Sequence, residues 1–317
     1  MSEGYMVERI DNICVNKLSV GDCLKKISDS FGVSIELDGN SICVTGDNNL
    51  RNLRATNVIK ALNKLSEEDD IDNRLVDYII FLAQNNHLEE FMNASDEVFY
   101  TTPTGRPIKA KTLGQRVYVD ALSRSELVIC SGPAGSGKTF LGVAMAVKAF
   151  RNREVSRIIL CRPAVEAGER LGFLPGDIEE KVNPYMRPIY DALELLLGKE
   201  MADRYYEKGL IEVSPLAFMR GRNLDDAFVL LDEAQNTTVE QMKMFLTRLG
   251  MNCKALACGD FTQIDLPRGQ TSGLYDAINV LNDIEGINIV SLNNSDIVRN
   301  SLVQRIVEAY DRREKEN

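Results

Sequence analysis

Hydrophobic residues between positions 127 and 292 fall into short, nearly continuous runs, and stretches with helical spacing separate most of these runs. Short apolar runs of this kind are typical of strands that are buried on both faces of a parallel sheet. Helices between such strands cover the two faces, so the pattern predicts an α/β fold. The predicted strands are 127–130, 157–161, 211–214, 227–231, 254–258 and 287–292, and the predicted helices are 138–150, 177–197, 238–250 and 271–283.

A smaller α/β pattern precedes this region. Two alternating runs flank Asp38-Gly39-Asn40, which is a strong signal for a β-hairpin. The β-α-β-β-α order is compatible with a KH-like RNA-binding module, but the G-x-x-G loop that grips RNA in KH domains is absent, and a plain packing domain fits equally well. The predicted strands here are 10–15, 33–37 and 41–44, and the predicted helices are 20–31, 57–65 and 71–92.

A linker composition at 101–107, rich in Thr, Pro and Gly, divides the two patterns. We therefore expect a small N-terminal α/β domain with its following helix over residues 1–100 and a larger α/β domain over residues 101–317. The basic residues Lys109, Lys111 and Arg116 follow the linker and fit either a solvated connector or a nucleic-acid contact.

Composition narrows the functional classes. The chain has 317 residues, a net charge of −10 and seven cysteines without a C-x-x-C pair. No apolar run approaches the roughly 18 residues of a membrane span, and the N-terminus lacks a secretory pattern, so we expect a cytoplasmic protein with reduced thiols and no membrane partner. The negative charge means that any nucleic-acid contact must come from a local basic surface.

The strongest motif follows the strand 127–130. Residues 132–139 match G-x-x-x-x-G-K-[ST], and a predicted helix begins directly after them. The glycines allow backbone N–H groups to surround phosphate oxygens, and the helix directs its positive end at the same anion. Lys138 is expected to reach the β- and γ-phosphates of ATP, and the Thr139 hydroxyl to bind Mg²⁺. The predicted nucleotide-binding residues are Gly132, Pro133, Ala134, Gly135, Ser136, Gly137, Lys138 and Thr139.

Two acids end a later buried strand and complete the predicted catalytic set. Asp232 is expected to hold Mg²⁺, and Glu233 to orient and polarise the attacking water. The strand 254–258 leads to Asp260 and Gln263, which could sense a γ-phosphate, although Asp260 equally fits a turn former. This G-D-x-x-Q pattern resembles motif III of superfamily 1 helicases.

Three further residues are candidates for nucleotide or strand contacts. Gln115 could bind the adenine edge through its amide. Arg299 follows the last strand and could stabilise charge on the γ-phosphate, in cis or from a neighbouring subunit, or could form a surface salt bridge. Arg162, with Pro163, occupies the place where helicases of this superfamily have a strand-binding loop.

Long stretches of the sequence resemble the PhoH family of ATPases. The resemblance implies a single RecA-like domain with Mg²⁺-dependent ATP hydrolysis, and homo-oligomers that include hexameric rings. It also implies an RNA-helicase role and, as partner, a ribosome-maturation endoribonuclease. Arg299 is retained, but the loop after it lacks the family's usual His-Pro. The matching blocks are 161–177, 231–248, 259–270 and 302–307.

Three functions remain open at this stage. The first is an ATPase that remodels or unwinds RNA, and the second is a nucleotide-dependent scaffold that recruits a nuclease or ribosomal partner. The third, a small-molecule phosphotransferase, is disfavoured because Asp232, Glu233 and Gln263 favour water as the acceptor. A helicase of this type binds ATP between two RecA-like domains, so a ring of subunits would have to supply the second wall.

Overall fold

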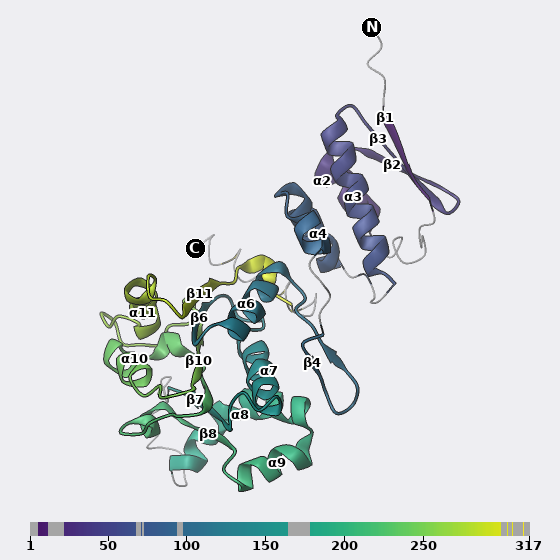
Figure 1. Cartoon of the computed structure of the whole chain (residues 1–317). Coiled ribbons are helices and arrows are strands. Elements are labelled where there is room, and N and C mark those ends of the chain that lie inside the picture. Colours follow the sequence, from purple (N-terminus) through teal and green to yellow (C-terminus); the bar gives the residue numbers. More distant parts are fainter. Residues whose placement is uncertain are drawn as a thin grey trace. The chain divides into compact units, whose positions relative to one another are not determined.

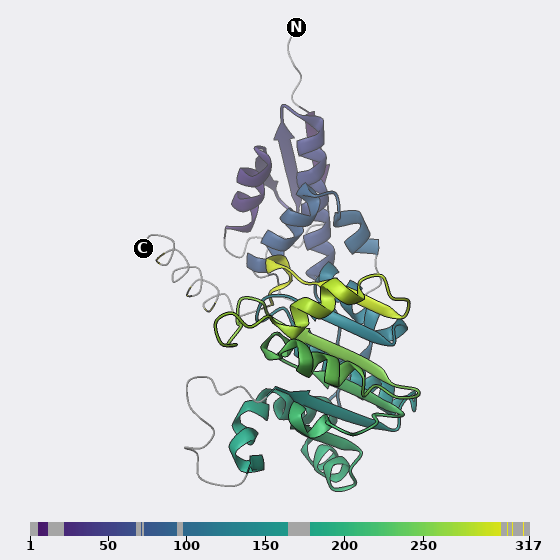
Figure 2. The same ribbon diagram turned by 90° about the vertical axis from the view of Figure 1, so that its left-hand side faces the viewer.

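The computed structural model describes residues 6–11, 22–67, 71, 73–93, 98–163, 178–298, 303, 306 and 313. The chain divides into two compact units, one that includes Met1–Ser95 and the other spanning Asp96–Val298 (Figures 1 and 2). Among the described helices, none combines the length and the apolar character that crossing a bilayer requires.

The larger unit is built on a six-stranded parallel sheet in the order β11-β6-β10-β9-β7-β8. The predicted strands and the α/β fold class are confirmed. Because β10 lies between β6 and β9, the segments that follow these three strands meet at one edge of the sheet. The strands are β6 (Leu127–Ser131), β7 (Arg157–Arg162), β8 (Ile211–Pro215), β9 (Ala227–Leu231), β10 (Lys254–Gly259) and β11 (Ile287–Ser291).

Helices cover both faces of this sheet, with α6 to α9 on one side and α10 and α11 on the other (Figure 1). Alternate strand residues point to opposite faces of the sheet. Val128 and Cys130 therefore pack in the core on the side of α6 to α9, and Leu127 and Ile129 in the core on the side of α10 and α11. The helices are α6 (Leu113–Arg124), α7 (Lys138–Arg151), α8 (Ile178–Leu197), α9 (Lys199–Glu207), α10 (Val239–Leu246) and α11 (Gly273–Leu281).

The linker region differs from the sequence-based expectation. Residues Tyr100–Thr101 and Pro107–Ile108 pair as the short hairpin β4–β5, and helix α6 follows it. The Thr112 side chain accepts a hydrogen bond from the backbone N–H of Gln115, which caps the start of α6. Tyr118 and Leu122 of α6 are buried in the core, so this segment is an integral part of the larger unit.

The smaller unit contains a three-stranded antiparallel sheet in the order β1-β3-β2. The hairpin of β2 (Ser34–Asp38) and β3 (Ser41–Gly46) and helix α2 (Cys23–Phe31) follow the prediction. Strand β1 (Met6–Ile10) lies earlier than predicted, and residues 12–15 fall outside the described chain.

The last helices of this unit also depart from the predicted bounds. Helix α3 (Asn49–Leu65) is longer than predicted because the Asn48 side chain caps it. The helix predicted over 71–92 is divided into α4 (Asn73–Gln84) and α5 (Leu88–Asn93), with Asn86 between them in the left-handed region at φ 62°. A residue in this conformation cannot continue a right-handed helix.

Candidate active site

Residues 132–139, which lead from the end of β6 into the first turn of α7, form a phosphate-binding loop. Gly135 and Gly137 have φ values of 84° and 87°, which glycine adopts without strain. The Gly132 N–H donates to the carbonyl of Gly259, which fixes the loop to the end of β10. The first turn of α7 leaves backbone N–H groups without helical acceptors, as an anion site requires.

Lys138 is placed directly over this loop. Its side chain is buried, and Nζ donates to the carbonyl oxygens of Gly132 at 2.7 Å and Pro133 at 2.9 Å. A buried ammonium with only carbonyl partners lacks a counter-ion among these contacts, and the phosphate groups of a nucleotide would supply one. Binding of the β- and γ-phosphates by Lys138 stays a prediction that these contacts fit.

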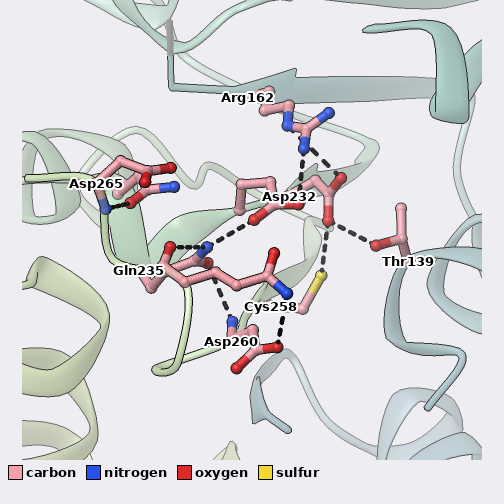
Figure 3. Close-up of polar contacts among 10 residues, drawn as sticks. Thr139, Arg162, Asp232, Gln235, Cys258, Asp260 and Asp265 are labelled. Carbon is pink, nitrogen blue, oxygen red and sulfur yellow. Dashed lines mark hydrogen bonds and ion pairs between the residues drawn. The ribbon is translucent and has the colours of Figure 1, made fainter. Parts of the chain in front are cut away.

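Thr139 and Asp232 meet at the predicted metal position. The Thr139 hydroxyl donates to Oδ1 of Asp232 at 2.6 Å, although the two residues are far apart in the sequence (Figure 3). The pKa of Asp232 lies above its ordinary value, because burial raises it more than the Arg162 charge and the Thr139 hydrogen bond lower it. A hydroxyl and a carboxylate are hard oxygen ligands, so this pair fits Mg²⁺ that shares its coordination with nucleotide phosphates and water.

Glu233 occupies a constrained position immediately after Asp232. Its backbone is left-handed, with φ 51° and ψ 37°, a conformation that is uncommon for residues other than glycine. Oε1 accepts a hydrogen bond from Arg162 Nη2 at 2.6 Å, and Oε2 accepts one from Gln235 Nε2 at 2.6 Å. Strained backbone and two close donors fix the direction of this carboxylate.

The amide of Gln235 connects Glu233 to the loop after β10. Nε2 donates to Oε2 of Glu233 and to the carbonyl of Gln263, and Oε1 accepts from the N–H of Asp260 at 3.1 Å (Figure 3). The side chain is fully buried. A Cβ on Gly259 would lie 2.4 Å from Oε1 of Gln235, so the close packing of this amide requires glycine there.

Asp260 and Gln263 lie in that loop. Oδ1 of Asp260 accepts from the N–H and hydroxyl of Thr262, which is the turn-forming arrangement that the sequence left open. Gln263 Nε2 donates to Oδ2 of Asp260 at 3.3 Å, and the Gln263 residue is exposed. Sensing of a γ-phosphate by Gln263 stays a prediction.

Gln115 and Val298 contact the backbone of the phosphate-binding loop. The buried Gln115 amide accepts from the Lys111 N–H at 2.8 Å and donates to the Ser136 carbonyl at 3.0 Å. Both ends of the amide thus bind backbone groups, and adenine recognition stays a prediction. Arg299 lies outside the described residues, but the N–H of Val298 donates to the Gly135 carbonyl at 2.9 Å.

Comparison with known proteins agrees with this geometry. The PhoH-like protein family model matches residues 107–311. A PhoH-like protein of Bacillus subtilis is 48% identical over 91% of each chain. This chain belongs to the PhoH-like protein family.

Other relatives match mainly the larger unit. A PhoH-like protein of Mycobacterium tuberculosis is 56% identical over 67% of this chain and 60% of its own length. Protein PhoH of Escherichia coli is 47% identical over 64% of this chain and 58% of its own length. A solved structure of Pif1 helicase from Candida albicans aligns with 63% of this chain and 43% of its own, at 15% identity and a TM-score of 0.33, a likeness too weak to carry an argument.

Family membership and the phosphate-binding loop together indicate a P-loop nucleotide-binding protein. Two residues of the site were not assigned to it from the sequence. Arg162 was assigned to a strand-binding loop, which stays a prediction, and its contact with Glu233 was not foreseen. Gln235 was given no part in the site. The signal for Gln235 was its position directly after the acid pair, in Asp-Glu-Ala-Gln.

Proposed function

We propose that this PhoH-like chain is a Mg²⁺-dependent ATPase that couples hydrolysis to the remodelling or unwinding of RNA. The observation that carries the proposal is the 2.6 Å hydrogen bond between Thr139 and Asp232, beside Lys138 and Glu233. It supports the proposal because it brings the two candidate Mg²⁺ ligands together beside the phosphate-binding loop. A chance glycine turn would not bring a hydroxyl and a carboxylate from distant segments together.

Each residue has a distinct task in this proposal. The loop N–H groups and Lys138 bind the phosphates, and Thr139 and Asp232 hold Mg²⁺, which supplies charge neutralisation at the phosphates when bound. Glu233 holds a water molecule in line and polarises it. Arg299, in cis or from a neighbouring subunit, stabilises the charge that develops as the phosphoryl group transfers.

Coupling to RNA draws support from helix α3 in the smaller unit. All of its charged side chains are basic, Arg51, Arg54, Lys60 and Lys64, in a chain whose net charge is −10. Arg51, Lys60 and Lys64 are exposed. Lys60 and Lys64 are one helical turn apart and share one face of α3, so they give this acidic chain a small basic surface of the kind that phosphate-backbone binding needs.

A second candidate function is a nucleotide-dependent scaffold that recruits an endoribonuclease or a ribosomal partner without moving along RNA. One observation favours it: the described residues contain a single six-stranded parallel sheet, whereas a translocating helicase encloses ATP between two such domains. A homo-oligomer, and specifically a hexameric ring, would remove this objection, because the neighbouring subunit would supply the second domain that encloses ATP.

The test is the steady-state rate of ATP hydrolysis with and without single-stranded RNA, on protein whose mass is measured by light scattering. Strong stimulation in an oligomer is expected if the chain is an RNA-coupled motor. Turnover that no nucleic acid changes would favour the scaffold. A variant with Lys60→Glu and Lys64→Glu should keep the basal rate, because the two lysines lie far from the catalytic residues in the sequence. It should lose much of the stimulation by RNA, because two positive charges that could bind the phosphate backbone become negative.

A further inference from the structure

Arg162 is the last residue of β7, and its guanidinium lies against the acid pair. Nη2 is 2.6 Å from Oε1 of Glu233, and Nε is 4.0 Å from Oδ2 of Asp232 (Figure 3). The side chain of Arg162 is only 19% exposed and that of Glu233 29%. Ion pairs that are largely withdrawn from water are screened less than surface pairs, so this contact fixes geometry more firmly than an exposed one.

Strand pairing determines where Arg162 lies. Strands β7 and β9 are parallel neighbours with Cys161 opposite Leu231. The N–H of Asp232 donates to the Cys161 carbonyl at 2.9 Å, which continues the ladder beyond the end of β9. The backbone at Arg162 is therefore held beside the acids, and its side chain needs no rearrangement to reach them.

Glu233 depends on outside contacts for its direction. A glutamate side chain has three rotatable bonds, and fixing it costs conformational free energy that its partners must offset. Arg162 binds one carboxylate oxygen and Gln235 binds the other. Loss of either donor would free the carboxylate to rotate away from the attacking water.

We propose that Arg162 is a positioning residue for Glu233, and that its ion pair sets the direction of this carboxylate for water activation. The inference rests on the proposed ATPase function. It assigns Arg162 to the rate of hydrolysis more than to nucleotide affinity, because its ion pair holds the carboxylate of Glu233, the residue proposed to activate water. Arginine suits the task because its planar fork keeps a fixed orientation, whereas a lysine ammonium is a flexible point charge.

The experiment compares Arg162→Gln and Arg162→Lys with a matched control, Arg222→Gln. Arg222 forms an equally close pair with Glu212, at 2.6 Å. We expect Arg162→Gln to lower kcat roughly 10- to 100-fold, with affinity for a slowly hydrolysed ATP analogue and Mg²⁺ changed less than about threefold. Arg162→Lys should recover part of the rate, and Arg222→Gln should leave both quantities unchanged.

A double variant separates positioning from a general structural effect. Adding Arg162→Gln to Glu233→Gln should change single-turnover hydrolysis no further, because the carboxylate that Arg162 directs is already gone. An equal fractional loss in both backgrounds would overturn the inference. So would a rise in kcat for Arg162→Gln, or a loss of analogue affinity that matches the loss of rate.

Failure of the proposed function gives a different result. If the wild-type protein binds the analogue but does not hydrolyse ATP, the ATPase assignment falls, and the assignment of Arg162 falls with it. If the wild-type protein hydrolyses ATP and Glu233→Gln does not, the function stands, and the Arg162 variants decide the inference alone.

Discussion

Two close arginine–glutamate pairs involve neighbouring strands of the same sheet, since Arg162 ends β7 and Glu212 lies in β8. Arg162 approaches Glu233 at 2.6 Å, and Arg222 approaches Glu212 at 2.6 and 2.7 Å. The second pair has the stronger hydrogen bonding, because Arg222 binds both carboxylate oxygens of Glu212. A close ion pair therefore does not mark a functional residue by itself.

The surroundings distinguish the two pairs. Glu233 has a left-handed backbone, follows a buried aspartate and shares its second oxygen with Gln235. Glu212 lies within the edge strand β8, and its additional partner is the nearby Ser214 hydroxyl. The first pair connects the ends of separate strands around a phosphate-binding loop, whereas the second joins a strand to the segment that follows it. Position at the carboxyl edge, and not pairing strength, indicates function.

The largest expected effect is that of Lys138→Ala. Removing the ammonium leaves the phosphates without their main side-chain counter-charge, so we expect ATP turnover to fall by at least roughly 10³-fold. Phosphate release measures it directly. Neither ion pair is touched by this change, and appreciable turnover in the variant would show that the loop is not the reaction site.

Glu233→Gln and Glu212→Gln test the comparison itself. We expect the first variant to bind ATP while its turnover falls by about 10²-fold or more, because an amide cannot polarise water as a carboxylate does. The second should keep wild-type turnover. Equilibrium ATP binding and initial rates on both proteins provide the measurement. Equal loss of binding and turnover in Glu233→Gln would make Glu233 a structural residue.

Gly259→Ala should have an intermediate effect on the first pair. The added Cβ would meet Oε1 and the backbone nitrogen of Gln235, at 2.4 and 2.9 Å, and Cδ2 of Leu274 at 2.7 Å. Gln235, which binds Glu233, would therefore have to shift. We expect a loss of about 1–3 kcal/mol in unfolding free energy and a fall of about 10-fold in turnover.

The control for this variant is Gly39→Ala in the smaller unit, where no atom lies within 4 Å of the added Cβ. It should lower stability through its left-handed backbone and leave turnover unchanged. Full turnover in Gly259→Ala would show that the contact between Gln235 and Glu233 does not matter for the rate.

The smallest effect concerns the pH dependence of the second pair. Hydrogen bonds from Arg222 hold the pKa of Glu212 below its ordinary value. The pair therefore stabilises the folded protein above the unfolded carboxyl pKa of about 4.3, and this contribution is lost as the pH falls through the lowered folded pKa. Urea midpoints of the wild type and Glu212→Gln should differ modestly at pH 7 and converge as the pH falls. A constant difference at all pH values would exclude the charge as the cause.

Much of the larger unit could be predicted from the sequence. Its strands are short apolar runs. The phosphate-binding loop and the acid pair are each made of consecutive residues, so the local sequence pattern was sufficient to find them. Helix α6 was missed although Thr112 and Gln115 have the spacing of an N-terminal cap and the third residue of a helix. The segment before it has the composition of a linker, and basic residues surround its start. The sequence was therefore interpreted as a solvated connector or a nucleic-acid contact and not as a helix.

The contacts of Arg162 and Gln235 could not be derived in the same way. Arg162 reaches Glu233 only because β7 lies beside β9, and hydrophobic periodicity does not specify the order of strands in a sheet. Gln235 reaches the loop after β10 because Gly259 lets the two backbones approach closely. Both facts are features of the tertiary structure and cannot be read from local sequence patterns.

The most direct test of the account is the initial rate of phosphate release from ATP by the purified wild-type chain, measured with Mg²⁺ and again after Mg²⁺ is chelated. We predict measurable release that requires Mg²⁺ and that Lys138→Ala abolishes. Binding of ATP without any release, or release that persists after chelation, would contradict the assignment of Thr139, Asp232 and Glu233 to ATP hydrolysis.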